Sequence, residues 1–468
     1  MNQMTALLRR LVFAFLVFII SSISFADNLS FSQAWSVLQE NNDGLAAAYE
    51  NQEKSIHMIE AAEDLYWPEI GITADYTRLD DEVSLEPSDL FDSMPRGDVL
   101  QRFLNGLGRI DGIPLSQIDD AFTSKMTKDY VVISSLTAVW PVYAGGRIDA
   151  AQDIAFNQLA EAKYLSRIKK QALFEQLAKV YFGVVLAKQV LAAQTEAEKG
   201  LFKHFDNSKK LQKEGQIARV ERLKAEASYD KSRVEKNKAK RELEIAQVAL
   251  NHLLKEKRNI NPKSRLFINN TLPSMAEITT ETLKNHPGLG VLDSKRKQAQ
   301  GFVDVKKGEY LPEVFLFGNY NLYEQDTLAA DLAPDWMVGV GVKIPITTRG
   351  GRSGKLKAAK STIIELDYLT TQAIQDLKLL VEKTWREANT ALEEYNGLKS
   401  SLALAQENIH LRDAAYAQGL SSSLEVIDAK LFLAGVKIQR QAAAYEYVLS
   451  LARLLALSDQ MASFSGYQ

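Results

Sequence analysis

Four short segments of the chain alternate between apolar and polar residues, which is the pattern of a β-strand with one apolar face. In the clearest of them, Trp336 to Ile344, the even positions are tryptophan, valine and isoleucine, whereas the odd positions include two glycines and a lysine. The other three are Glu69–Thr77, Tyr130–Trp140, which ends at Pro141, and Glu313–Leu322. We expect a strand from each.

Apolar residues three or four apart fill most of the remaining chain and predict helices. The two longest stretches lie at 147–213 and 352–417, and at 1.5 Å per residue each is roughly 100 Å long. Shorter helices are expected at 30–64, which opens with the capping-box residues Ser30 and Gln33, and at 220–254, 276–308 and 424–457. Helices of this length cannot bury an apolar stripe alone, so we expect them to pack side by side.

The second half of the chain repeats the plan of the first. Asn41, Tyr66, Pro68 and Glu69 recur 244 positions later, whereas Pro141, Gly215 and Glu221 recur 204 positions later. The two shifts differ by 40, so the first half carries an insertion of about that length. We assign it to 79–129, a stretch rich in proline, glycine and acidic residues that predicts a long exposed loop.

These boundaries predict a first repeat at 27–256, a linker at 257–275, a second repeat at 276–457 and a C-terminal tail at 458–468. The first 26 residues have the pattern of a secretory signal peptide. Arg9 and Arg10 precede an apolar run at 11–20, and Ser24-Phe25-Ala26 is a small-x-small cleavage site. The apolar run is too short to cross a bilayer as a helix.

The composition argues against several classes of protein. The formal net charge is −3 and there is no cysteine, which gives no support to nucleic-acid binding, disulfides, thiolate chemistry or a lipid anchor on an N-terminal cysteine. The five histidines are not at metal-ligand spacing, and no phosphate-binding G-x-x-x-x-G-K-[ST] motif is present. We therefore expect no cofactor and no metal, and an enzyme is the least expected class.

Four strands are too few for one chain to form a transmembrane barrel, because strand edges cannot stay unpaired in lipid and closure takes about eight strands. Three copies would supply 12 strands. The apolar faces would then contact lipid, with Trp140, Tyr143 and Trp336 as interfacial aromatics. The alternative is a soluble sandwich, although nothing else in the chain supplies a second sheet.

Two glycine turns end the longest predicted helices, and each is followed six residues later by a glutamate. The first pairs Gly215 with Glu221, and the second pairs Gly419 with Glu425 and adds Asp428. We expect both turns to form the inner mouth of a pore, where a ring of carboxylates would favour cations or raise some of their pKa values. The alternative is that these acids only stabilise helix starts, near the positive end of the helix dipole.

Across the whole chain after residue 26, the motifs together resemble the TolC-type outer-membrane efflux proteins of Gram-negative bacteria. The motifs are LSFSQAWSVLQENN, YWPEI and YLPEV at strand starts, VWPVYAGGR and IPITTRGGR at strand-to-helix junctions, and KEGQIARVERLKA and YAQGLSSSLEVIDA at the turns. The resemblance implies a mainly α-helical homotrimer. A 12-stranded barrel would span the outer membrane and continue as a long helical barrel through the periplasm.

By the same resemblance, the protein would be the exit duct of an efflux or type I secretion system. It would open when an inner-membrane pump and its periplasmic adaptor dock. A periplasmic coiled-coil adaptor or structural protein, with the strands in a soluble domain, is the alternative. Neither the exported substrate nor the cognate pump is indicated.

The resemblance also suggests roles for residues of the turns. Glu221, Glu425 and Asp428 match acidic constriction positions, and Tyr416 matches a tyrosine that links subunit elements. Ser421 stands where a well-known family member has an arginine, so Arg219 and Arg222 on the other turn are candidate replacements. The adaptor-docking turns would comprise Gly215, Gly419, Leu420 and Ser422. The acidic loop would lie on the outer rim, as a variable surface loop, a lid or a receptor contact.

Overall fold

The computed structural model describes residues 28–86, 94–99, 102–103, 106, 123–256, 260–324 and 327–468. The predicted signal peptide and most of the predicted acidic loop lie outside these residues. The chain forms two compact units. The first comprises Met1–Ser55, Gln158–Arg296 and Glu365–Gln468, and the second Ile56–Asn157 and Lys297–Ile364.

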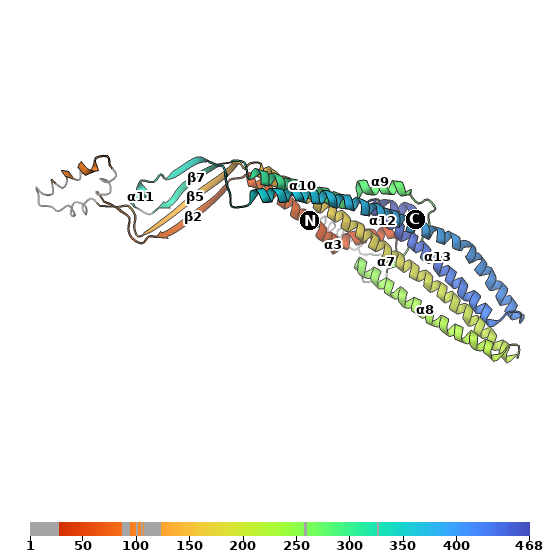
Figure 1. The fold of residues 1–468 in the computed structure, drawn as a ribbon. Coiled ribbons are helices and arrows are strands. Elements are labelled where there is room, and N and C mark those ends of the chain that lie inside the picture. The colour runs from red at the N-terminus through yellow and green to blue at the C-terminus, as the bar shows by residue number, and fades with distance from the viewer. Residues whose placement is uncertain are drawn as a thin grey trace, which may run out of the picture. The chain divides into compact units, whose positions relative to one another are not determined.

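The second unit contains a four-stranded antiparallel sheet in the order β2 (Glu69–Arg78), β5 (Tyr130–Tyr143), β7 (Glu313–Glu324) and β8 (Trp336–Lys343) (Figure 1). The four predicted strands are confirmed. The end predicted for the second strand is wrong, because β5 continues through Pro141 to Tyr143 with a register shift at that point. A proline lacks the N–H of a regular ladder but is accommodated at such an irregularity.

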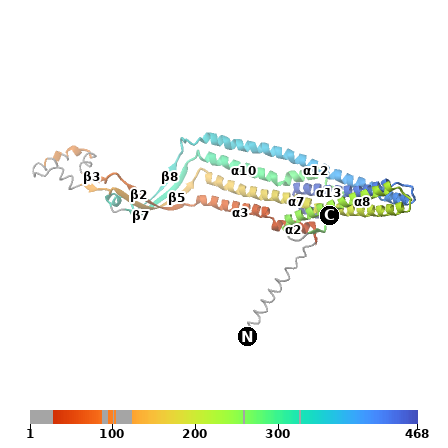
Figure 2. The ribbon, with the colours of Figure 1, turned by 90° about the horizontal axis from the view of Figure 1, so that it is seen from below.

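One face of this sheet is apolar and open. Ile70, Ile72, Val338 and Val340 are 64–74% exposed. Between the two register shifts of β5 and β7, the pairing of Ile70 with Ala138 and of Gly318 with Val338 places the even-numbered residues of the strands on one face. On the opposite face, the Phe317 ring lies where a side chain at position 339 would be, which the glycine there permits. Figure 2 shows the four strands in another view.

Several short elements accompany the sheet and the helices. The strands β1 (Asn28–Leu29) and β6 (Asn261–Pro262) pair in parallel, and β3 (Ser84–Leu85) pairs with β4 (Ser124–Lys125). The helix α11 (Leu328–Asp331) follows β7, and 3₁₀ turns lie at η1 (Asp64–Tyr66) and η2 (Met461–Tyr467).

Long helices form two antiparallel hairpins, whose turns lie in the first unit, whereas the first residues of the two long helices, 147–157 and 352–364, belong to the second. The 67-residue α7 (Arg147–Lys213) is followed by α8 (Arg219–Leu254), and the 66-residue α12 (Arg352–Ala417) is followed by α13 (Ser423–Leu457) (Figure 1). The bounds of both long helices match the predicted 147–213 and 352–417. Each starts after a glycine with positive φ, Gly146 at 74° and Gly351 at 64°, a conformation that favours glycine.

Two predicted helices are each broken in two. The stretch 30–64 contains α2 (Phe31–Asn41) and α3 (Asp43–Glu63), separated by Asn42 in an extended conformation. The Asn42 side chain accepts a hydrogen bond from the Leu45 N–H and so caps the second helix. The capping box predicted at Ser30 and Gln33 is confirmed.

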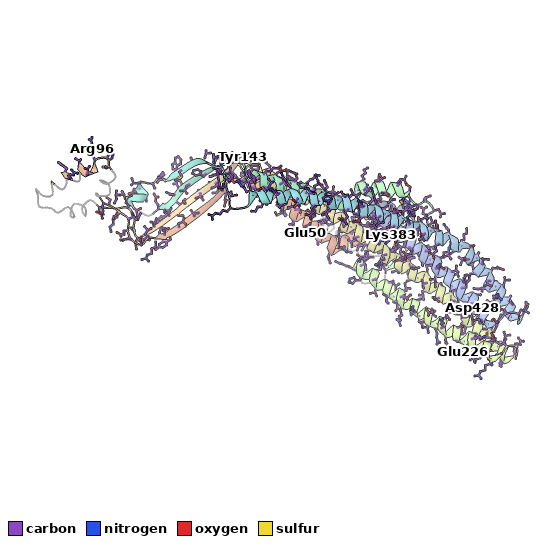
Figure 3. All side chains as sticks on the ribbon, viewed as in Figure 1. Glu50, Arg96, Tyr143, Glu226, Lys383 and Asp428 are labelled. Atoms are coloured by element: carbon purple, nitrogen blue, oxygen red, sulfur yellow. The ribbon has the colours of Figure 1, made fainter. Side chains whose placement is uncertain are left out.

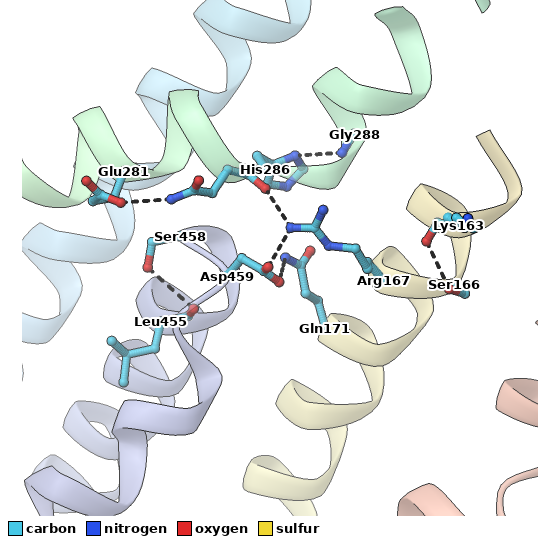
Figure 4. A network of polar contacts seen from close by, with 11 residues as sticks. Lys163, Ser166, Arg167, Gln171, Glu281, His286, Gly288, Leu455, Ser458 and Asp459 are labelled. Carbon is cyan, nitrogen blue, oxygen red and sulfur yellow. Dashed lines mark hydrogen bonds and ion pairs between the residues drawn. The ribbon is translucent and has the colours of Figure 1, made fainter. Parts of the chain in front are cut away.

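The stretch 276–308 contains α9 (Met275–Asn285) and α10 (Pro287–Gly308). The break lies at His286 because the proline that follows disfavours helical backbone at the residue before it. Arg167 on α7 holds this break: its guanidinium donates to the Asn285 carbonyl at 3.3 Å and to the Asp459 carboxylate at 2.6 Å (Figure 4). Gln171 donates to the same carboxylate at 3.2 Å.

The main core of the first unit is aromatic and includes the C-terminal segment predicted as a tail. Phe31, Phe174, Phe182 and Phe464 are at most 3% exposed, and their ring centroids lie 4.9–6.1 Å apart. The element that carries Phe464 is η2, so residues 461–467 are part of the packed structure. Among the described helices, only α7 has a stretch apolar enough to cross a membrane, and α7 supplies Phe174 and Phe182 to this core.

Candidate channel gate at the helical turns

Each hairpin turns at a glycine in the left-handed conformation. Gly215 has φ 74° and Gly419 has φ 75°. The next residue closes each turn, since the Gln216 N–H bonds the Leu211 carbonyl and the Leu420 N–H bonds the Ala415 carbonyl, both at 2.8 Å. This is the Schellman pattern of helix ends, and it explains why glycine recurs at this place in both repeats.

Glu425 lies in the first turn of α13, where it completes a capping box with Ser422. Its carboxylate accepts hydrogen bonds from the Ser421 hydroxyl at 2.6 Å and the Ser422 N–H at 2.9 Å, and from Arg412 at 2.9 Å. The Ser421 hydroxyl, then the Ser422 N–H and Arg412, hold the pKa of Glu425 below its usual range. The carboxylate therefore stays ionised at neutral pH.

Glu221 reaches from α8 to the same helix start. Its carboxylate accepts the Ser423 N–H at 3.0 Å and the Lys224 ammonium at 3.1 Å. Burial raises the pKa of Glu221, but the hydrogen bonds from Lys224 and Ser423 outweigh it, so the pKa is lowered overall. Two successive N–H groups at the start of α13 thus each bind a carboxylate, one from each hairpin.

Asp428 differs from these two acids. It is exposed, and it has no hydrogen-bond or ion-pair partner among the residues that the structure describes. Asp428 and Glu226 both lie close to the turns of their hairpins (Figure 3). The interpretation that these acids stabilise helix starts accounts for Glu221 and Glu425 within one chain, whereas Asp428 makes no such contact among the described residues. A role for the three in a constriction stays a prediction.

The arginines at the turns have other partners than expected. Arg222 pairs with Glu226 on its own helix, and Arg219 is exposed and has no partner within the described part of the chain. The arginine at Glu425 is instead Arg412, from the helix before the turn. The sequence contains a signal for this pair, because the last turns of one helix in an antiparallel hairpin face the first turns of the next.

Tyr416 is 7% exposed and belongs to a polar cluster between the hairpins. Its hydroxyl hydrogen-bonds the Ser208 hydroxyl at 2.8 Å, and its ring centroid lies 4.6 Å from that of His204. His204 Nε2 in turn lies 2.7 Å from the Ser423 hydroxyl oxygen. That Tyr416 links subunits stays a prediction. Within the chain, its hydrogen bond to Ser208 joins α12 to α7.

An ion pair between one buried and one exposed residue lies beside this cluster. Lys430 on α13 is 9% exposed and donates to Asp413 on α12 at 2.8 Å. Burial, and then the charge of Lys430, lower the pKa of His204 to about 4, so this histidine is neutral at neutral pH. Sequence reasoning missed His204 and Ser208, since their partners lie 219 and 208 positions away, and it missed Lys430, whose partner Asp413 lies 17 positions away across the turn.

The remaining candidate residues lie on the surface of the chain. Leu420 at the second turn is 77% exposed and Ser422 is exposed, which leaves them free for the predicted docking role. Of the predicted interfacial aromatics, Trp140 is 48%, Tyr143 46% and Trp336 61% exposed. The Trp140 indole donates to the Tyr66 carbonyl at 2.8 Å, and Figure 3 shows Tyr143 at the end of β5.

Comparison with known proteins identifies the family to which this chain belongs. The family model described as outer membrane efflux protein matches residues 35–254 and 278–458. The chain belongs to the outer membrane efflux protein family. The two matched ranges are close to the two predicted repeats, and the resemblance drawn from the motifs is confirmed.

Relatives of the outer membrane efflux protein family match nearly the whole chain. The outer membrane protein TolC of Escherichia coli (strain K12) is 19% identical over 463 residues, 92% of this chain and 82% of TolC. The CmeC outer membrane channel of Campylobacter jejuni is 15% identical with a TM-score of 0.71, over 92% of this chain and 86% of CmeC. The open state of the Neisseria gonorrhoeae MtrE outer membrane channel is 17% identical with a TM-score of 0.70, over 92% and 89%.

The chain is thus a channel of the outer membrane of Gram-negative bacteria that extends into the periplasm, and it has the fold of solved outer membrane channels. The alternative of a periplasmic adaptor with a soluble strand domain is wrong, since the family match covers both repeats. The exposed apolar face of the sheet agrees with this, because a soluble protein rarely leaves so large an apolar patch open.

Proposed function

We propose that three copies of the chain form a passive exit duct, which receives its substrate from an inner-membrane pump and a periplasmic adaptor. The topology of the sheet supports an assembly of three chains. The strands β2 and β8 each have only one neighbouring strand within the described residues. They run in opposite directions, so β8 of one copy can pair antiparallel with β2 of the next, and three copies give a closed barrel of 12 strands.

The proposed duct has no energy source of its own. The sequence contains no phosphate-binding motif that would couple transport to nucleotide hydrolysis, so a partner must supply the energy. The exposed Leu420 and the small residues beside it offer an adaptor a contact surface at the turn. Efflux and type I secretion both use a duct of this kind, and the residues described here do not favour one over the other.

The contact between the two hairpins carries the gating part of the proposal. Glu221 on α8 binds the Ser423 N–H of α13, and Ser208 on α7 binds Tyr416 of α12. These bonds hold one hairpin against the other at the turns. A channel narrowed there would widen when the bonds break, and Asp428, which has no described partner, would be available to face the passing ion or substrate.

Single-channel recording in planar bilayers tests the function. We expect the purified protein to form detergent-stable trimers with a small conductance at neutral pH and a preference for cations. The double variant Glu425→Ala/Asp428→Ala should lose that preference while still forming trimers. An unchanged cation preference in this variant would show that the carboxylates do not line the constriction. A protein that conducts no ions would contradict the proposal that the chain forms a duct.

A further inference from the structure

We propose that His204 makes the gate acid-sensitive, because a proton on its imidazole weakens the contact between the two hairpins and favours opening. The inference rests on the proposed function in one respect, namely that separation of the hairpin turns opens the channel. It adds a residue and a signal, the pH of the periplasm, that the proposed gate does not itself contain.

His204 lies where both hairpins meet. Its ring is 3% exposed, contacts the Tyr416 ring of α12, and reaches the Ser423 hydroxyl of α13 at 2.7 Å. Ser423 is the first residue of α13, and its N–H is bound by Glu221 of α8. One imidazole on α7 is therefore in contact with α12 and α13 and connected through Ser423 to α8.

The surroundings of His204 oppose a positive charge. Lys430 of α13 lies close by, and the acids that face the imidazole, Asp413 of α12 and Glu221 of α8, both lie near enough to attract a proton. Both acids are already engaged, Asp413 by Lys430 at 2.8 Å and Glu221 by Lys224 at 3.1 Å.

The helix that carries the histidine adds no compensating acid at the ring. Lys203, Lys210 and Glu214 of α7 line the same groove as His204, and Lys210 is already paired with Asp206 of its own helix at 2.7 Å. No hydrogen-bond partner for Nδ1 lies within the described residues. A proton on this largely buried ring would thus gain no hydrogen bond from the protein at Nδ1, and burial of the charge is costly.

Protonation and opening are linked. In the closed arrangement burial lowers the pKa of His204 to about 4, whereas a histidine exposed by opening titrates near 6.5. The open form then binds more protons between these two values, so acid favours it throughout that window. With these two pKa values the opening equilibrium of each protomer increases at most about 20-fold from pH 7 to pH 5.

The test is the open probability of the purified full-length channel in planar bilayers at pH 7 and pH 5. The wild type is expected to open at least several-fold more at pH 5, since the proposed trimer has one such histidine in each protomer. His204→Gln keeps a side-chain amide that can bond Ser423 but cannot gain a proton, so it should stay closed at both pH values. His410→Gln, a change at an exposed histidine of α12, should respond as the wild type does.

Two results would overturn the proposal: a wild-type channel with no response to pH, or a His204→Gln channel with the wild-type response, which would assign the effect to the carboxylates. Ser423→Ala gives a second test, because it retains the histidine but removes its hydroxyl partner. This variant should be more open at pH 7 and respond less to acid, and an unchanged closed state would contradict the proposal. A wild-type protein that forms no channel would contradict the proposed function as well.

Discussion

Arg412 and Glu425 face each other across the turn between α12 and α13, with 2.9 Å between the guanidinium Nη1 and the carboxylate Oε1. Their side chains are 41% and 44% exposed. An ion pair this open to water contributes about 0–1 kcal/mol and weakens as salt is added. The pair is thus a weak link between α12 and α13, within one hairpin.

The first prediction concerns this pair. Arg412→Gln removes the positive partner but leaves the capping box of Glu425 intact, so helix α13 should still begin at Ser423. Glu425 and Glu221 bind adjacent N–H groups, so a Glu425 charge that Arg412 no longer balances repels Glu221 of the other hairpin. We expect the open probability at neutral pH and low salt to rise by a factor of up to about 5, the equivalent of about 1 kcal/mol. Single-channel recording at low and high salt measures this, and the difference from the wild type should shrink in high salt.

Arg219→Gln is the matched control. It removes the same charge from the other turn, where the arginine has no described partner within the chain. We expect no change in open probability. If Arg219→Gln opened the channel and Arg412→Gln did not, the arginine that holds the gate would be the one predicted from the sequence.

The second prediction ranks the acids by their effect on ion selectivity. Asp428→Asn should reduce the preference for cations more than Glu221→Gln, because the charge of Glu221 is already balanced by Lys224 at 3.1 Å, whereas Asp428 has no such partner in the described part of the chain. Reversal potentials in a salt gradient measure the preference. The opposite ranking would show that Glu221 faces the pore.

The third prediction concerns the glycine of the second turn. Gly419 has φ 75°, so Gly419→Ala forces a left-handed conformation on a residue with a Cβ, at a cost of about 1–2 kcal/mol. Thermal unfolding followed by circular dichroism should show a lower Tm. Gly397→Ala, in the exposed interior of α12 with no atom near the added methyl group, should raise stability by up to about 1 kcal/mol.

The fourth prediction concerns the C-terminal segment. Phe464 is 1% exposed and packs on Phe31 at 4.9 Å between ring centroids. Phe464→Ala should destabilise the first unit by about 3–5 kcal/mol, because it removes a buried ring and leaves a cavity. The midpoint of thermal unfolding measures this, and Ser465→Ala, an exposed neighbour, should stay within about 0.5 kcal/mol of the wild type. Equal stability of both variants would make the segment a dispensable tail.

Local patterns predicted most of the architecture. The alternation in Trp336 to Ile344 identified β8 because strand side chains alternate between faces, and Gly215 and Gly419 identified the turns because few residues tolerate their positive φ. The repetition of the plan in the second half of the chain supported the prediction of both the strands and the turns. Helix breaks were harder to predict: Pro287 marks one, but Asn42 marks the other only through a side-chain cap that many asparagines do not form.

The contacts of the gate were largely beyond sequence reasoning. The bond between His204 and Ser423 joins residues 219 positions apart, and that between Ser208 and Tyr416 joins residues 208 apart. No local period indicates such pairs, because tertiary packing brings them together. Arg412 is the exception, since it lies 13 positions from Glu425 across one turn, and hairpin geometry points to it.

The open edges of β2 and β8 have a consequence for biogenesis. A single copy cannot enter lipid with these edges bare, since each unpaired backbone group there costs several kcal/mol. In the proposed trimer, insertion of the sheet and association of the copies would then be one event, whose yield depends steeply on the concentration of chains. A single chain in the periplasm would expose the apolar face of its sheet to water, and it would need a chaperone to keep it from aggregating.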